Sequence, residues 1–315
     1  MAKIPLERTI ESAYRFAFTK FLSVLGVLWL PYLVVGAALA GIIYLAWPDI
    51  QSLHDVGWAM QASPNEEINF SAEHFVALMR VIGSIGRFAG LLWLLFIIAR
   101  AMVTVGVLRT ALGQHEGPVF VYFSLGAAVW RMIGAMLLAA IIIVLVLCLT
   151  AAACALIFFG ADRFASGAAG AIKFVAVAAA FFWMVYMIFR LVFFLPPVVV
   201  AEGRIGIGRA WELGGGNVLR IIGVLIAVFL PVAIVAGIIS NALFGAILWN
   251  EVRGALLSGH PLPPHAFFEA LVRDLRYIWP VFVAYQLVYM TVLAGLGGGA
   301  MAAAYKSVTQ TEAAA

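Results

Sequence analysis

Six long apolar runs constrain this chain more than any other feature. They cover residues 21–47, 88–110, 132–159, 174–200, 221–249 and 280–305. A helix needs about 20 mostly apolar residues to cross the hydrocarbon core of a bilayer. Only 11% of the 315 residues are charged, whereas a soluble domain carries about 25% charged residues. The runs therefore predict an all-α, polytopic membrane protein with six transmembrane helices, forming a single integral membrane domain over residues 1–315.

The stretch from Arg190 to Arg220 indicates how these runs are connected. Arg190 lies inside the fourth run, Pro196-Pro197 closes that run, and Glu202 follows it. A short amphipathic segment then leads to Arg220, where the fifth run begins. This order predicts a helix that leaves the membrane, a segment on its surface, and a helix that re-enters. Further connecting segments are expected at 117–131 and 160–170, with a surface helix at 265–278.

The distribution of basic residues predicts the orientation. Six spans place both termini on one side of the membrane. That side carries ten basic residues: Lys3, Arg8, Arg15, Lys20, Arg109, Arg131, Arg204, Arg209, Arg220 and Lys306. The opposite side carries seven: Arg80, Arg87, Arg163, Lys173, Arg253, Arg273 and Arg276. Because cytoplasmic loops are richer in Lys and Arg, we expect both termini in the cytoplasm of a bacterium, with the chain in the inner membrane.

A threefold internal repeat is a further hypothesis. Lys20, Arg131 and Arg220 each precede two large apolar residues, a small residue and a span. In the first two units an arginine in the returning span, Arg100 or Arg190, stands thirteen residues before a glycine. We therefore expect three parallel repeats of a surface helix plus a pair of spans, over residues 6–113, 117–203 and 205–306.

Arg100 and Arg190 are the leading candidates for a binding site. An arginine at the centre of a bilayer costs about 2.5–3.5 kcal/mol on insertion scales, and no span contains a carboxylate to offset it. We expect both side chains to face the protein interior. Backbone carbonyls, water or a bound anion could stabilise them there, or they could only snorkel or cap helices. The candidate site for an anion or lipid headgroup comprises Arg100, Arg190, Glu202 and Arg220.

No pattern typical of catalysis or of a cofactor is present. The sequence lacks a Walker loop, a dinucleotide-binding glycine pattern, His-Glu-xx-His and Gly-x-Ser-x-Gly. We expect no catalytic residue, cofactor or metal, and the small net charge of +4 argues against a nucleic-acid partner. Two glycine pairs, Gly86/Gly90 and Gly295/Gly299, allow close helix approach, either inside the chain or between chains in a homo- or hetero-oligomer.

The residues around the double proline resemble a known family. They are Arg190, Pro196-Pro197, Glu202-Gly203, Arg209-Ala210-Trp211, Gly216-Asn217 and Arg220, with an apolar run behind them. In this order they resemble the membrane region found with some bacterial glycerophosphoryl diester phosphodiesterases. The metal-binding carboxylates and histidines of the phosphodiesterase domain have no counterpart in these residues. The resemblance implies an inner-membrane location and a polytopic helical fold, without the hydrolase activity.

These observations favour a non-enzymatic membrane protein that binds or senses a phospholipid or another anionic amphiphile. A small-molecule transporter is the first alternative, because repeats can enclose a site near the middle of the membrane. A scaffolding or assembly subunit for another membrane protein is the second, because glycine-rich faces suit contacts between helices. An intramembrane enzyme is the least favoured, since no acid, base or nucleophile set stands within the spans.

Overall fold

The regular secondary structure of the residues that the structure describes is all helical. The computed structural model describes residues 3–61, 72–114, 122–164, 167–258 and 264–313. Within them lie α1 (Leu6–Thr19), α2 (Phe21–Gln61), α3 (Ala72–Leu112), α4 (Ala127–Phe164), α5 (Ala169–Val192), α6 (Leu195–Glu202), α7 (Ile207–Gly214), α8 (Val218–Ser258) and α9 (Pro264–Ala313). Six segments are long and apolar enough to cross a membrane, so the all-α polytopic prediction is confirmed.

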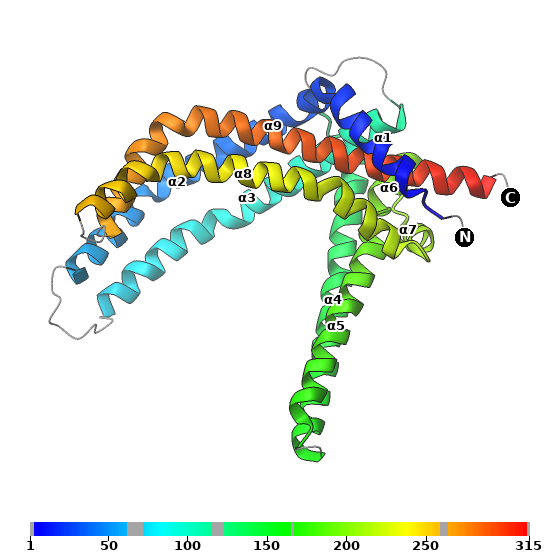
Figure 1. Cartoon of the computed structure of the whole chain (residues 1–315), viewed down its shortest axis with the longest axis horizontal. Coiled ribbons are helices and arrows are strands. Elements are labelled where there is room, and N and C mark those ends of the chain that lie inside the picture. The colour runs from blue at the N-terminus through cyan, green and yellow to red at the C-terminus, as the bar shows by residue number, and fades with distance from the viewer. Residues whose placement is uncertain (1–2, 62–71, 115–121, 165–166, 259–263, 314–315) are drawn as a thin grey trace.

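The long helices form two arms that meet at a common base (Figure 1). One arm contains α2, α3, α8 and α9, and the other is the hairpin of α4 and α5. The short helices α1, α6 and α7 lie at the base, and both termini lie there too. The outer parts of the arms expose large apolar side chains such as Leu149, Phe182 and Ile238. A lipid environment can accept such surfaces, whereas water would not.

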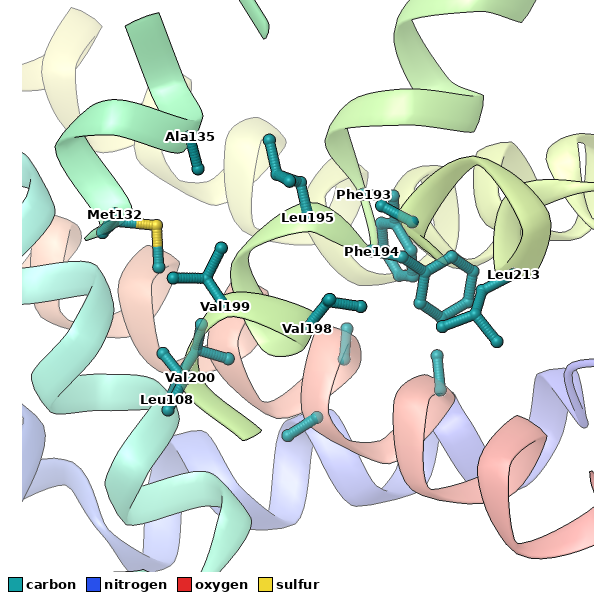
Figure 2. Close-up of a cluster of buried hydrophobic side chains, with 14 of the residues drawn as sticks. Leu108, Met132, Ala135, Phe193, Phe194, Leu195, Val198, Val199, Val200 and Leu213 are labelled. Carbon is teal, nitrogen blue, oxygen red and sulfur yellow. The ribbon is translucent and has the colours of Figure 1, made fainter. Parts of the chain in front are cut away.

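The short helix α6 occupies the centre of the base. Its residues from Leu195 to Val200 are all buried. Around it lie Leu108 of α3, Met132 and Ala135 of α4, and Leu213 of α7 (Figure 2). Because one helix touches α3, α4, α5, α7 and α9, it joins the two arms through a single apolar core.

The double proline explains why α6 is separate from α5. The helix α5 ends at Val192, and Pro196 and Pro197 stand in the first turn of α6. A proline has no backbone N–H, so it fits the first turn of a helix, where the N–H groups lack intrahelical partners, whereas inside a helix it kinks or breaks it. The fourth span was predicted to run to residue 200, and a segment long and apolar enough to cross a membrane does extend from Ala169 to Glu202. The helix is interrupted within it between Val192 and Leu195, a break that was not predicted. The surface segment expected after Glu202 is partly buried, since Ala210, Leu213 and Gly214 of α7 belong to the core.

The helix α1 lies across α8 and α9 and is fixed at its start by two polar side chains. The side-chain oxygen of Asn217 accepts a hydrogen bond from the backbone N–H of Ile4 at 3.1 Å. The guanidinium of Arg220 donates to the backbone carbonyl of Ile4 at 2.8 Å. Asn217 is buried, and a buried amide without partners would be costly, so these contacts set the position of the N-terminal segment.

A proline in α8 gives α1 a second anchor. Pro231 cannot donate to the carbonyl of Ala227, four residues earlier, and that carbonyl loses its helical partner. The hydroxyl of Tyr14 on α1 donates to the carbonyl of Ala227 at 3.2 Å and to that of Val228 at 3.1 Å. The tyrosine therefore satisfies a backbone group that the proline leaves free.

Small residues bring α1 against α9. A Cβ atom built on Gly295 would stand 3.0 Å from the Cα of Ala17, and one built on Gly299 would stand 3.0 Å from the Cα of Ala13. This contact lies inside the chain, which is one of the two options predicted for Gly295/Gly299. The sequence left both options open because α1 is far from this pair along the chain. Cβ atoms on Gly86 and Gly90 would meet nothing within 4 Å.

Several helices are longer than the sequence predicted. The segment 265–278 is no separate helix, since α9 runs unbroken through Pro280. Likewise α4 already includes Arg131 and continues to Phe164. Pro280 lies inside α9, as Pro231 lies inside α8, so a single proline does not end these long helices. Residues 117–121 and 261–263 lie outside the described parts of the chain.

The proposed repeat stays a prediction. The helices pair as α2 with α3, α4 with α5 and α8 with α9, and each pair begins and ends at the base (Figure 1). In the first two units, the glycines thirteen residues after Arg100 and Arg190 have left-handed backbones, with φ of 77° at Gly113 and 66° at Gly203. Both follow directly on a helix end, which is a common glycine role.

We expect Gly299→Ala to loosen the contact between α1 and α9. Its new methyl group would meet the backbone of Ala13, which can yield only if α1 moves, and overpacking of this kind costs roughly 1–3 kcal/mol. Gly297→Ala is the matched control, because its nearest contact would be the ring of Phe229 at an ordinary 3.5 Å. Thermal unfolding in mild detergent should show a lower melting temperature for Gly299→Ala alone. Equal melting temperatures for the two variants would contradict the close contact between α1 and α9.

Candidate functional site

A basic groove lies between α1 and α9 at the base of the molecule. It has a volume of about 920 Å³. Its lining includes five basic side chains: Lys3, Arg8, Arg15, Lys20 and Lys306. Among the residues that the structure describes, no aspartate or glutamate lines it. A cavity surrounded by one sign of charge concentrates ions of the opposite sign, so this groove is suited to an anion.

The helical spacing of α1 produces the basic wall. Arg8, Ser12, Arg15 and Thr19 recur at intervals of four, three and four residues, which places them on one face of a helix. Ala13 and Ala17 are buried against α9 on the neighbouring face. Because the alanines hold the backbones together, the larger polar side chains line the groove beside the contact.

Most of the basic side chains have no partner within the part of the chain that the structure describes. Lys3, Arg8, Arg15 and Lys20 form no hydrogen bond or ion pair there through their side chains. Lys306 differs, since its ammonium group donates to the carbonyl of Ala111 at 3.2 Å. That carbonyl is in the last turn of α3, where a cation is favourable. Four cations of the groove are therefore free to bind a ligand.

Apart from Pro5 and Phe16, the rest of the lining is small or polar. Gly299, Ala302 and Ala303 of α9 contribute little side-chain volume, which leaves room for a ligand. Ser12 and Gln310 add a hydroxyl and an amide that can donate hydrogen bonds. Such a wall offers donors to an anion without a competing carboxylate.

Arg190, a predicted site residue, is instead held by its own chain. Its Nε donates to the carbonyl of Trp211 at 3.2 Å, and Nη1 donates to the hydroxyl of Tyr186 at 2.6 Å. The guanidinium carbon stands 3.9 Å from the centroid of the Trp211 ring, a distance typical of a cation–π interaction. It also belongs to the last turn of α5, where the helix dipole favours a cation. These contacts offset the burial of the charge without a ligand.

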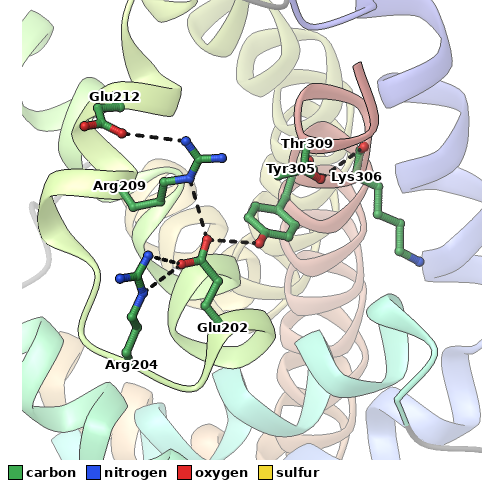
Figure 3. A network of polar contacts seen from close by, with 7 residues as sticks. All are labelled: Glu202, Arg204, Arg209, Glu212, Tyr305, Lys306 and Thr309. Carbon is green, nitrogen blue, oxygen red and sulfur yellow. Dashed lines mark hydrogen bonds and ion pairs between the residues drawn. The ribbon is translucent and has the colours of Figure 1, made fainter. Parts of the chain in front are cut away.

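Glu202 is the centre of an internal polar network (Figure 3). One carboxylate oxygen accepts hydrogen bonds from Nε and Nη2 of Arg204 at 3.0 and 2.8 Å. The other accepts one from the hydroxyl of Tyr305 at 3.3 Å and faces Nε of Arg209 at 3.7 Å. Glu202 ends α6 and Tyr305 belongs to α9, so the network connects the central helix α6 to α9.

The other two predicted site residues also differ from expectation. Arg220 is bound to the backbone of Ile4, as described above. Arg100 is exposed, so the prediction that it faces the interior is wrong. On α3 the residues Ala99, Met102 and Val103 are buried against neighbouring helices, and Arg100 falls on the remaining open side. The four predicted residues thus have separate surroundings and do not form one ligand site among the described residues.

Comparison with known proteins gives no relative. No family model, no curated protein and no solved structure matches this chain. The resemblance to the membrane region of glycerophosphoryl diester phosphodiesterases therefore stays a hypothesis. Within the described ranges, no group of three or more His, Cys, Asp or Glu is placed to hold a metal ion.

The sequence analysis missed the groove because it used the basic residues of α1 only to decide the orientation. One signal was available: Arg8, Ser12, Arg15 and Thr19 share a helical face. The opposite wall could not be inferred, because α9 is nearly 300 residues further along the chain and only tertiary packing places Lys306 beside α1.

Leucine substitutions at the two arginines of the spans should have different effects. Arg190→Leu removes two hydrogen bonds and a cation–π contact, which together are worth about 2 kcal/mol or more. Arg100→Leu is the matched control, because that exposed side chain has no such partners and an apolar replacement suits the membrane. Melting temperatures in detergent should fall by several degrees for Arg190→Leu and stay unchanged or rise for Arg100→Leu.

The same two variants test the headgroup hypothesis for the arginines. Phospholipid that copurifies with the protein should be unchanged in Arg190→Leu, as quantified by mass spectrometry. Loss of bound lipid with an unchanged melting temperature would contradict a structural role for Arg190.

Proposed function

We propose that this protein is a non-enzymatic, multi-pass protein of the bacterial inner membrane that binds or senses a phospholipid or another anionic amphiphile through the groove between α1 and α9. The observation that carries this proposal is the set of five basic side chains in a groove lined by no carboxylate. Four of them lack a partner in the described residues, so their charges are available to a ligand.

The position of the groove supports an amphiphilic ligand. Lys20 lines one end of it, and the first span begins at the next residue, Phe21. Phe18 and Leu22 on either side of this junction are exposed apolar residues. A charged headgroup in the groove would therefore have apolar surface close by for its chain. A polar headgroup beside a lipid-facing helix is the usual geometry at a membrane interface.

The orientation follows from the same charges. We propose that the base of the molecule faces the cytoplasm, because all ten basic residues on the side of the termini belong to the base or to helix ends that meet there. The anionic lipids of the cytoplasmic leaflet would then lie on the same side as the groove.

The two alternatives have less support. A transporter built on Arg100 and Arg190 needs both in one cavity, whereas Arg190 is held by Trp211 and Tyr186 and Arg100 is exposed elsewhere. A scaffold built on Gly295 and Gly299 needs an open glycine face, whereas α1 covers it.

Cysteine labelling tests the orientation. In a background with Cys148 and Cys154 replaced by alanine, Gly167→Cys between α4 and α5 should react with a membrane-impermeant maleimide in intact cells. Gly208→Cys in α7 should react only after the cells are permeabilised. A Cβ at either glycine would meet nothing within 4 Å, so both substitutions suit the fold. The reverse pattern would contradict a cytoplasmic base.

Charge removal tests the groove. We expect the triple variant R8Q/R15Q/K20Q to bind phosphatidylglycerol about 100-fold more weakly, since each Lys or Arg near an anionic surface contributes about 1 kcal/mol. The matched control R80Q/R163Q/R253Q removes three exposed basic residues from the other ends of the helices. Native mass spectrometry of both variants in detergent, with phosphatidylcholine as the neutral lipid, gives the comparison. The proposal would be contradicted if phosphatidylglycerol binding fell equally in the two variants or fell in neither.

A further inference from the structure

The basic side chains of the groove are spread along it instead of meeting at one point. Arg8, Arg15 and Lys20 all lie on or directly after α1. A helix rises 1.5 Å per residue, so their Cα atoms span about 10 Å from Arg8 to Arg15 and about 18 Å from Arg8 to Lys20. Lys3 extends the row before α1, and Lys306 faces it from α9. The groove thus presents a line of positive charge about as long as a small ligand.

A single phosphate would leave part of this row unpaired. Each guanidinium binds two oxygens of one phosphate through its planar fork, and a lysine acts as a point charge at close range. Two neighbouring side chains of the row can reach the same phosphate, but the Cα atoms of Arg8 and Lys20 are about 18 Å apart. The cations on α1 and directly after it therefore match separate anionic groups of one ligand.

The remaining lining fits the same interpretation. Ser12 lies between Arg8 and Arg15 on the helical face and has no hydrogen bond in the described residues, so its hydroxyl can donate to an oxygen between two charged groups. Small side chains of α9 leave a volume of about 920 Å³, which lies within the range of small-molecule sites. Among the described residues, the lining contains no carboxylate that could repel a second or third negative charge of the ligand.

We infer that the groove binds a ligand that carries two or more phosphate groups, as the headgroup of a multiply phosphorylated lipid or as a soluble polyphosphate. This inference rests on the proposed function, in which the groove is the anion site. It adds the number of phosphates and their arrangement along α1.

The number of phosphates can be tested with soluble anions. Calorimetric titration of the full chain in neutral detergent, at constant ionic strength, would compare orthophosphate, pyrophosphate and tripolyphosphate. We expect each added phosphate to tighten binding roughly tenfold, since each brings further charge-assisted hydrogen bonds. R8Q, R15Q and K20Q should each weaken tripolyphosphate binding, while R163Q should leave it unchanged.

The titration separates this inference from the proposed function. If tripolyphosphate binds no more tightly than orthophosphate, and R8Q/R15Q/K20Q still loses phosphatidylglycerol, the groove is a site for one phosphate and the inference is overturned alone. If R8Q/R15Q/K20Q changes the binding of no anion and of no lipid, both are overturned.

A second experiment identifies whether the phosphates belong to a lipid or to a soluble ligand. Nanodiscs of phosphatidylcholine would contain either cardiolipin, with two phosphates, or twice as much phosphatidylglycerol, with one each. A preference for cardiolipin that R15Q abolishes supports a lipid ligand. Tight binding of tripolyphosphate without that preference supports a soluble ligand. If neither tripolyphosphate nor cardiolipin is preferred, the inference is overturned.

Discussion

The burial of α6 is the contact on which the rest of the structure depends. Leu195 to Val200 fill the space where α3, α4, α7 and α9 converge. Helices in a membrane gain little from hiding apolar surface, because lipid is equally apolar, and they associate through close packing and hydrogen bonds. A helix of eight residues can enter the junction of two arms only because prolines end the preceding span and start a new helix. The α4–α5 hairpin also contacts the four-helix arm directly, through α4 with α3 and α5 with α8, and α6 adds a buried apolar link between the two.

The position of α1 depends in turn on backbone groups that need partners. Asn217 and Arg220 bind both polar groups of the Ile4 backbone, and Tyr14 binds the carbonyl that Pro231 leaves free. In an apolar environment an unpaired backbone group costs several kcal/mol. These requirements hold α1 in one place, and the basic face of α1 then becomes one wall of a groove. The candidate binding site is thus a consequence of satisfied hydrogen bonds elsewhere at the base.

Arg100 and Arg190 show how much the surroundings of a charge decide its role. Both stand thirteen residues before a glycine with a left-handed backbone. Arg190 lies where α5 ends and α7 folds back, so a carbonyl, a tyrosine hydroxyl and an indole ring surround it. Arg100 lies inside an unbroken helix, and its side chain is exposed. The same residue is therefore a structural contact in one case and an exposed charge in the other.

The sequence by itself determined the class of the fold. Long apolar runs predict transmembrane spans, because they contain very few charged residues. The runs 21–47, 88–110 and 221–249 lie within α2, α3 and α8. The helical face of Arg8, Ser12, Arg15 and Thr19 was also readable, since it depends only on local spacing. Tertiary structure alone decided that α6 is the centre of the core, that Gly295 and Gly299 contact α1, and that Lys306 lines the same groove as Arg8 and Arg15. Those contacts join residues up to 300 positions apart, and their energies depend on which helix faces come together, a choice that local spacing does not encode.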